Sequence, residues 1–111
     1  MAEVGRGEIW QFAFPRPDRK RPVLVLTRQD MIGRLATVTI APITSTVRGV
    51  PSEVVVGEES GLKRRSAVNL HNVATVSQQR LGPRLSHLNA RRMGEICAAL
   101  RFSVGCDGDW P

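Results

Sequence analysis

Two short apolar runs rich in β-branched residues constrain the fold of this chain most strongly. They are residues 21–27 (RPVLVLT) and residues 36–44 (ATVTIAPIT). Both runs are too short for a core helix, so both predict strands, and the unbroken first run predicts burial on both faces. Arg21 marks the start of the first run and Thr44 the end of the second. If the two strands pair antiparallel, these polar residues meet at the same edge of the sheet.

The rest of the chain predicts more short strands and then one helix. Strands are expected at residues 8–14, 52–56, 66–70, 73–76 and 84–88. Gly82 and Pro83 are expected to interrupt the chain before the last strand. Asn89 is a suitable N-cap, apolar residues then recur at spacings of three and four up to Val104, and Gly105 supplies a stop. This order predicts an α+β, mainly β fold: a strongly curved sheet or half-open barrel of five to seven strands with a C-terminal helix.

Length and charge limit the class of protein. The 111 residues suit a single domain, residues 1–111, with a core at about 5–105 and a polar tail at 106–111. The net charge of +6 favours an anionic partner, either nucleic acid or an acidic protein surface. Aromatic residues are too scarce for a platform that stacks many bases. No run of residues is apolar and long enough for a membrane span or a signal core, so we expect a cytoplasmic location and no membrane association.

Several common chemistries lack their motifs in this sequence. There is no phosphate-binding loop, no dinucleotide-binding glycine fingerprint and no Gly-x-Ser-x-Gly turn. The spacing of Cys97 and Cys106, with His71 and His87, is not that of a zinc site, and we expect both cysteines to be free thiols. The sequence therefore predicts neither a metal nor a cofactor.

Basic and hydroxyl-bearing side chains remain as the functional candidates. Residues 16–21 hold four cations, which repel one another unless water or an anion accommodates them. The segment is either a solvated hairpin tip or a loop that contacts phosphate. Arg21 has a structural alternative in an ion pair with an acid such as Glu53, and Thr44 has one in closing a turn through its hydroxyl. A second basic cluster lies at residues 63–65. Residue types alone predict a basic β-domain that binds a polyanion.

Four stretches taken together resemble the MazF/PemK (Kid-like) family of toxin endoribonucleases. They are residues 7–10 (GEIW), residues 21–25 (RPVLV), residues 41–45 (APITS), and a longer match from residues 66–68 (SAV) through 75–76 (TV) and 80–82 (RLG) to the closing helix. Their order and spacing agree over about residues 5–105. The resemblance implies a small SH3-like, PemK-type β-barrel with a C-terminal helix, working as a homodimer.

The resemblance also implies an activity. Family members cleave single-stranded RNA at a short sequence without a metal, through attack of the ribose 2′-hydroxyl on the adjacent phosphorus. The products are a 2′,3′-cyclic phosphate and a free 5′-hydroxyl, and the expected partner is an antitoxin with an acidic, partly disordered tail. The family's catalytic Arg falls on Arg21 and its catalytic Thr on Thr44.

The residue types suit that chemistry. A fixed guanidinium stabilises the extra negative charge of a pentavalent phosphorane, so we assign Arg21 chiefly to that role, with protonation of the leaving 5′-oxygen as a second candidate role. Thr44 would donate to a non-bridging oxygen. Candidates for the general base are Glu8, Asp18 and His71. The residues expected to hold RNA are Arg16, Arg19, Lys20, Thr46, Arg48, His71 and Asn72.

Two segments depart from the family pattern. The loop of residues 16–20 lacks the Gly-Ser-Glu that many members carry, and His71-Asn72 replaces an acid-Gln pair. Because both lie where such proteins contact RNA, the resemblance does not predict the target sequence. Two other functions stay open: a non-catalytic toxin of the same fold that inhibits a protein such as DNA gyrase, and a simple RNA-binding barrel.

Overall fold

The computed structural model describes residues 3–15 and 19–108. In that part of the chain, short strands precede one long helix, as the sequence predicts. In chain order the elements are β1 (Glu8–Ala13), β2 (Lys20–Val25), α1 (Gln29–Ile32), β3 (Thr37–Thr44), β4 (Glu53–Val56), η1 (Glu58–Ser60), β5 (Ser66–Asn69), β6 (Ala74–Ser77), η2 (Gln78–Arg80), β7 (Leu81–His87) and α2 (Ala90–Ser103).

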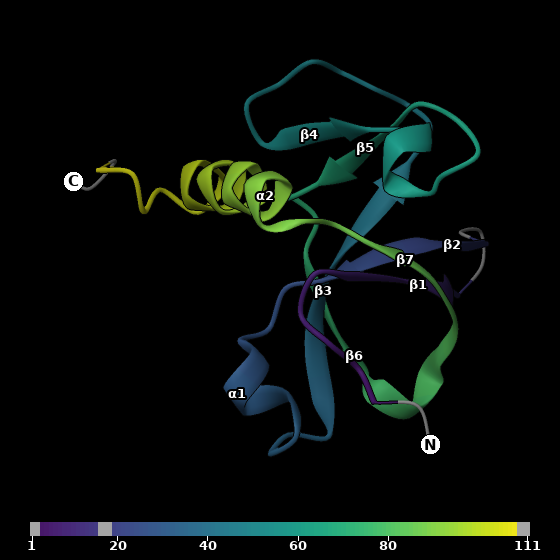
Figure 1. The fold of residues 1–111 in the computed structure, drawn as a ribbon. Coiled ribbons are helices and arrows are strands. Elements are labelled where there is room, and N and C mark those ends of the chain that lie inside the picture. The colour runs from purple at the N-terminus through teal and green to yellow at the C-terminus, as the bar shows by residue number, and fades with distance from the viewer. Residues whose placement is uncertain (1–2, 16–18, 109–111) are drawn as a thin grey trace.

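The strands form one antiparallel sheet that curves but does not close. Its order is β4-β5-β3-β2-β1-β7, and β6 pairs with β3. β5 and β6 follow one another along the same edge of β3, while β2 occupies the other edge. β4 and β7 are therefore the outer strands of this path, and Figure 1 shows β4 and β5 in the upper part of the sheet and β6 in the lower part. The architecture is the half-open form of the expected barrel.

The central strands are buried on both faces, because successive side chains along each strand pack alternately into two separate hydrophobic cores. Ile9 and Leu24 belong to a core that includes Ile96 of α2. Trp10 and Val23, their neighbours in sequence, belong to a second core on the opposite face. Leu24 and Val23 are both fully buried, which confirms the expected two-sided burial of this apolar run.

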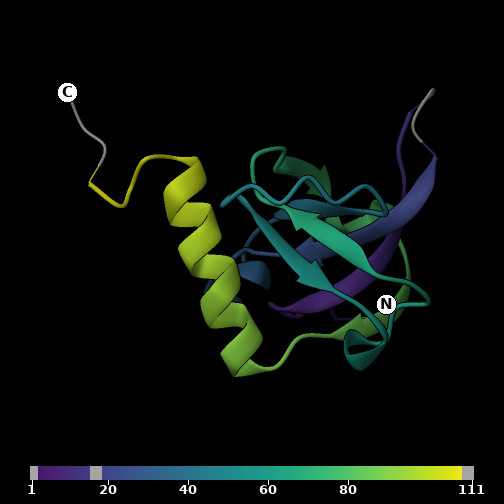
Figure 2. The same cartoon turned by 90° about the horizontal axis from the view of Figure 1, so that it is seen from above.

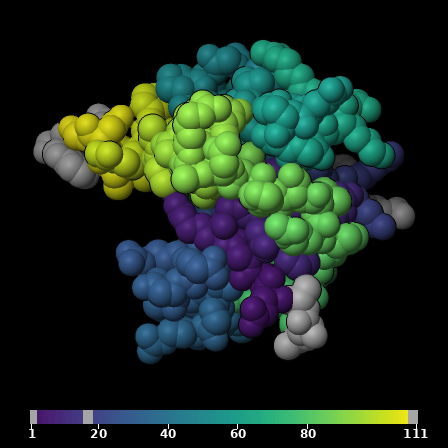
Figure 3. Space-filling model, in the orientation of Figure 1, coloured from purple at the N-terminus to yellow at the C-terminus, as the bar shows by residue number. Residues whose placement is uncertain are grey.

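The C-terminal helix begins and ends where the sequence predicts. The Asn89 side chain caps α2 by accepting a hydrogen bond from the backbone N–H of Arg92 at 2.9 Å. Gly105 follows the helix with a φ of 74°, a left-handed conformation that favours glycine. Seen from above, α2 lies along one side of the sheet (Figure 2), and it packs against the teal atoms of the β4–β5 region (Figure 3). Val104, expected to complete the apolar stripe, is 58% exposed.

Most strand bounds differ from the expected ones by one to three residues, and two of these differences have a clear structural reason. β2 starts at Lys20, one residue before the apolar run, because its pairing with β1 extends to Ala13↔Lys20. β7 runs through Gly82 and Pro83, which we expected to interrupt it. This is possible because β7 is an outer strand, where a missing N–H costs little, and because its register with β1 shifts twice.

Two simpler expectations concern the cysteines and the membrane. Cys97 and Cys106 are both free thiols, as predicted. Within the part of the chain that the structure describes, none of the helices combines the length and the apolar character needed to cross a bilayer.

Candidate active site

Arg21 and Thr44 approach one another because β2 and β3 pair antiparallel, as the sequence predicts. The last register pair between these strands is Val23↔Pro42. Continued by two residues, the same register places Arg21 opposite Thr44. Both residues are half-buried, and both line a single pocket.

The pocket opens where the ladder between β2 and β3 ends. Pro22 follows the last register pair and has no N–H with which to extend the ladder toward β3. On its other edge, the end of β3 pairs with β5, through Ile43↔Val68 and Thr44↔Ala67. The end of β3 therefore has β5 on one side and a gap toward β2 on the other.

This pocket, which we call the basic pocket, has a volume of about 920 Å³. Its polar lining consists of Gln11, Lys20, Arg21, Thr44, Ser45, Thr46, Lys63, Arg64 and Ser66. Its remaining lining is Pro22, Ile43, Gly61, Leu62, Pro83 and Leu85. Four of these side chains are cationic, and none of the described residues that line it is acidic. A site of this composition favours a polyanion such as a nucleic-acid backbone.

Aromatic side chains of β1 and the following residues accompany Arg21. Its guanidinium carbon lies 5.9 Å from the centroid of the Phe14 ring, a cation–π distance. Phe14 in turn meets Phe12 edge to face, with the ring centroids 4.8 Å apart. Phe12 is buried and pairs with Arg21 across the β1–β2 ladder. These contacts anchor the guanidinium near the pocket.

The Thr44 hydroxyl closes a turn, which is the structural alternative that the sequence suggested. Its Oγ1 donates to the carbonyl oxygen of Thr46 at 3.2 Å, a long and solvent-exposed hydrogen bond. The hydroxyl must release that carbonyl before it can donate to a bound phosphate. Thr44 lines the basic pocket, so its hydroxyl can donate to Thr46 in the free protein and to a phosphate when substrate is bound, but not to both at the same time.

Only some of the expected RNA-binding residues gather in the basic pocket. Lys20 and Thr46 line it, whereas Arg19 and Arg48 are exposed residues that do not. The backbone N–H of Arg48 donates to Glu53 Oε1 at 2.9 Å, which fixes the turn before β4. Arg16 lies outside the described residues, and its role stays a prediction.

His71 and Asn72 lie away from the basic pocket. They follow the end of β5, whereas Ser66, at the start of that strand, lines the pocket. At ~3.3 Å per residue, the two ends of β5 lie about 10 Å apart. His71 Nδ1 lies 2.5 Å from the hydroxyl of Ser52, a buried residue. As a general base, His71 would thus need a substrate that reaches well beyond the pocket, and Asp18 lies outside the described residues.

Glu8, the remaining candidate base, has a structural role. Its carboxylate accepts hydrogen bonds from the Gly5 N–H at 2.6 Å and from Trp10 Nε1 at 3.1 Å. It also forms an ion pair with Arg84 at 2.7 Å, which ties β1 to β7. Glu8 does not line the basic pocket. Separately, no group of three or more His, Cys, Asp or Glu side chains that suits a metal ion occurs within residues 3–15 and 19–108.

Sequence reasoning did not assign Lys63 and Arg64 to the site. The basic cluster was visible, but it lies about twenty residues from Thr44, and no spacing rule joins the two. The fold joins them because Gly61 packs closely against Ser86 of β7, and residues 61–64 line the pocket together with residues of that strand. This contact between distant segments has no local signal in the sequence.

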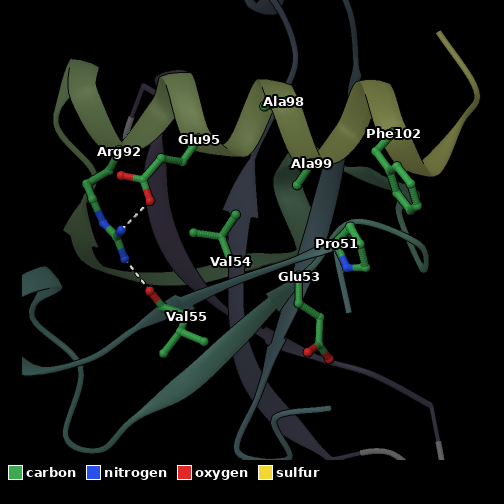
Figure 4. Close-up of a pocket in the computed structure, with 9 residues that line it drawn as sticks. All are labelled: Pro51, Glu53, Val54, Val55, Arg92, Glu95, Ala98, Ala99 and Phe102. Atoms are coloured by element: carbon green, nitrogen blue, oxygen red, sulfur yellow. Dashed lines mark hydrogen bonds and ion pairs between the residues drawn. The ribbon is translucent and has the colours of Figure 1, made fainter. Parts of the chain in front are cut away.

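A second pocket, of about 600 Å³, lies between β4 and α2 (Figure 4). Arg92 of α2 joins its two walls by donating to the backbone carbonyl of Val55 in β4, and it also donates to Glu95 on its own helix. Glu53, the acid that we considered as a partner for Arg21, lines this pocket and not the basic one. Acidic side chains outnumber basic ones in the lining of this second pocket, so its charge does not suit a polyanion. The basic pocket is therefore the candidate active site.

Comparisons with known proteins agree with this fold. Residues 5–104 match the family model described as PemK-like, MazF-like toxin of type II toxin–antitoxin system. The chain is 46% identical over 102 residues to the probable endoribonuclease MazF5 of Mycobacterium tuberculosis, covering 91% of this chain and 93% of the relative. It is 39% identical over 93 residues to endoribonuclease MazF3 of the same species, covering 84% and 88% respectively.

A solved structure supports the same assignment. The Mycobacterium tuberculosis toxin MazF-mt6 superposes with a TM-score of 0.81 at 36% identity, covering 93% of this chain and 99% of that one. The seven antiparallel strands of the described chain and its C-terminal helix thus have a counterpart of nearly the same length. The chain belongs to the PemK-like, MazF-like family of toxins of type II toxin–antitoxin systems.

Proposed function

We propose that this protein is a sequence-specific, metal-independent endoribonuclease toxin that cleaves single-stranded RNA in the cytoplasm. The observation that carries the proposal is the meeting of Arg21 and Thr44 in a pocket with four cations. Family membership and relatives named as endoribonucleases support the same activity. A charged guanidinium and a hydroxyl beside a phosphate-binding surface are the groups that phosphodiester cleavage uses.

The reaction forms one bond to phosphorus and breaks another. The ribose 2′-oxygen attacks the adjacent phosphorus and loses its proton, and the bond from phosphorus to the 5′-oxygen breaks as that oxygen takes up a proton. The products are a 2′,3′-cyclic phosphate and a 5′-hydroxyl, so no water is consumed. Arg21 stabilises the charge that develops on the pentavalent phosphorus centre, and Thr44 donates to a non-bridging oxygen.

The positive charge of the basic pocket suits both expected partners, because the RNA backbone and an acidic antitoxin tail are anionic. Lys20 and Thr46 line it and hold the RNA backbone beside the reacting phosphate. Arg16, Arg19, Arg48, His71 and Asn72 are proposed RNA contacts outside it, on the basis of the resemblance alone. A cognate antitoxin with an acidic tail neutralises the toxin, and the working form is a homodimer.

Mapping RNA ends in the absence of free metal tests the proposal. RNA treated with the purified protein in excess EDTA should carry new 5′-hydroxyl ends at one short sequence. Arg21→Ala should lower kcat by 10²- to 10³-fold, equivalent to ~3–4 kcal/mol, without unfolding the protein. Arg34→Ala is the matched control, because Arg34 is exposed beside α1 and should leave the rate unchanged.

The outcomes separate the three candidate functions. Intact RNA together with inhibited DNA supercoiling would favour a toxin that acts on gyrase. Intact RNA with tight, salt-sensitive binding would favour a simple RNA-binding barrel. Cleavage that a folded Arg21→Ala protein retains in full would reject the assignment of Arg21.

A further inference from the structure

Lys63 and Arg64 are the cations of the basic pocket that the cleavage step does not use. They precede β5, and both side chains are exposed. Their segment is positioned by Gly61, whose φ is +79° and which lies so close to Ser86 that an added Cβ would be 2.8 Å from the Ser86 Cβ. This close packing on β7 holds Lys63 and Arg64 over the pocket.

The two pairs of cations lie on opposite sides of Thr44. Lys20 and Arg21 belong to β2, whereas Lys63 and Arg64 lead into β5, and β3 runs between these strands. Paired strands lie ~4.8 Å apart, and β2 no longer pairs with β3 at this end, so β2 and β5 are separated by at least about 10 Å across the end of β3. One phosphate at Thr44 and Arg21 leaves the cations beside β5 with a separate anionic group to bind.

The charges on this side of the pocket have no acidic counterpart. Within residues 3–15 and 19–108, neither Lys63 nor Arg64 forms an ion pair. None of the described lining residues is acidic, so adjacent positive charges repel one another until an anion binds. Arg65, the next residue, does not line the pocket. Of the three cations at residues 63–65, Lys63 and Arg64 therefore belong to the pocket, and Arg65 does not.

Apolar side chains in the same pocket favour RNA over an acidic peptide. Pro83 and Leu85 of β7 line it, and Leu85 is 44% exposed. An exposed apolar surface beside cations suits the flat face of a nucleobase attached to a phosphate. A chain of carboxylates offers the charge but no large apolar face.

We propose that Lys63 and Arg64 form a second phosphate subsite, which binds an RNA phosphate next to the scissile one. The inference rests on the proposed ribonuclease function and adds to it how the substrate is held. The subsite fixes the RNA strand across the end of β3, so that the scissile phosphate meets Arg21 and Thr44. Its effect is on binding and on KM, whereas kcat at saturating RNA stays within a few-fold of the wild-type value.

The first test measures the salt dependence of RNA binding. The probe is a single-stranded RNA containing the mapped cleavage sequence, with a 2′-deoxy nucleotide that removes the attacking hydroxyl. Lys63→Ala and Arg64→Ala should each reduce the slope of log Kd against log salt by about 0.7, the value for one phosphate contact on a single strand. Arg65→Ala removes the same charge from the same cluster and should leave the slope unchanged.

The second test locates the phosphate. A neutral methylphosphonate replaces one linkage of the probe at a time. In the wild-type protein, the linkage beside the cleavage site should weaken binding when neutralised, and in Arg64→Ala the same replacement should have little further effect. Non-additivity at that linkage alone assigns the contact.

The outcomes of these two tests separate a specific phosphate subsite from its alternatives. Equal losses from Arg64→Ala and Arg65→Ala, or additive effects at every linkage, would overturn the subsite and leave only a general cationic field. Unchanged RNA binding with weakened binding of a polyglutamate peptide would assign these residues to an acidic protein partner instead. A protein that cleaves no RNA fails the earlier end-mapping experiment, so failure of the function and failure of the subsite are distinguishable.

Discussion

Replacing Thr44 by Val isolates the contribution of one hydroxyl. Val keeps the β-branched shape that suits β3, so the strand and its pairing with β5 should persist. The lost interaction is the hydrogen bond of 3.2 Å to the exposed carbonyl of Thr46. Water replaces the donor at that carbonyl, so the free energy of unfolding should fall by at most ~1 kcal/mol.

The catalytic loss should be larger than the loss of stability. A hydroxyl donating to a developing oxyanion contributes ~2.7–4 kcal/mol. The wild-type hydroxyl first releases Thr46, at a cost of ~0.5–1 kcal/mol, so about 2–3 kcal/mol remains. Since 1.36 kcal/mol equals a factor of ten, Thr44→Val should cleave about 30- to 150-fold more slowly.

Single-turnover cleavage of a labelled RNA at saturating protein measures this effect directly. Thr44→Ser is the matched control, because it keeps the hydroxyl and should retain activity within a few-fold. Thermal unfolding of the three proteins checks that each is folded under the assay conditions. A folded Thr44→Val protein with more than half the wild-type rate would refute the role of the hydroxyl. Equal inactivity of Thr44→Ser and Thr44→Val would show that shape, and not the hydroxyl, matters.

Three further substitutions test the fold that positions the site. Ile96→Ala should lower the free energy of unfolding by ~2–5 kcal/mol, because Ile96 is fully buried between α2 and the sheet; urea unfolding measures this. Asn89→Ala should cost about 1 kcal/mol in the same assay, since the α2 cap is lost, and an unchanged midpoint would contradict the capping role. Gly61→Ala should destabilise the protein and weaken RNA binding, because the new Cβ meets Ser86 and the backbone has a positive φ. Gly33→Ala, with open space around it and an ordinary φ, is the control and should change neither property.

The sequence predicted the parts of this protein that follow from local chemistry. The two β-branched runs are strands β2 and β3, and their antiparallel pairing brings Arg21 and Thr44 into one pocket. The helix was predictable because its cap, its period and its stop are all local signals. Both results needed only short-range patterns and a single pairing.

What the sequence missed depends on contacts between distant segments. β7 continues through Pro83 because it is an outer strand, and no local pattern shows which strand will be outermost. Lys63 and Arg64 reach the pocket because Gly61 packs on Ser86, a contact across more than twenty residues. His71 follows the end of β5 that is remote from the basic pocket. Residue type does not predict this, because the direction of the strand decides which of its ends reaches the site.

The location of the site follows from an interruption in the sheet. A continuous β2–β3 ladder would satisfy every backbone group and leave no gap for a ligand. Pro22 lacks the N–H that such a ladder needs at this point, and the β2–β3 pairing ends at Val23↔Pro42, while the other edge of β3 stays paired with β5. The residues just past the interruption are Arg21 and Thr44, which both line the basic pocket. Pro22 thus helps to open the pocket, and the strands on either side hold the guanidinium and the hydroxyl near the same phosphate.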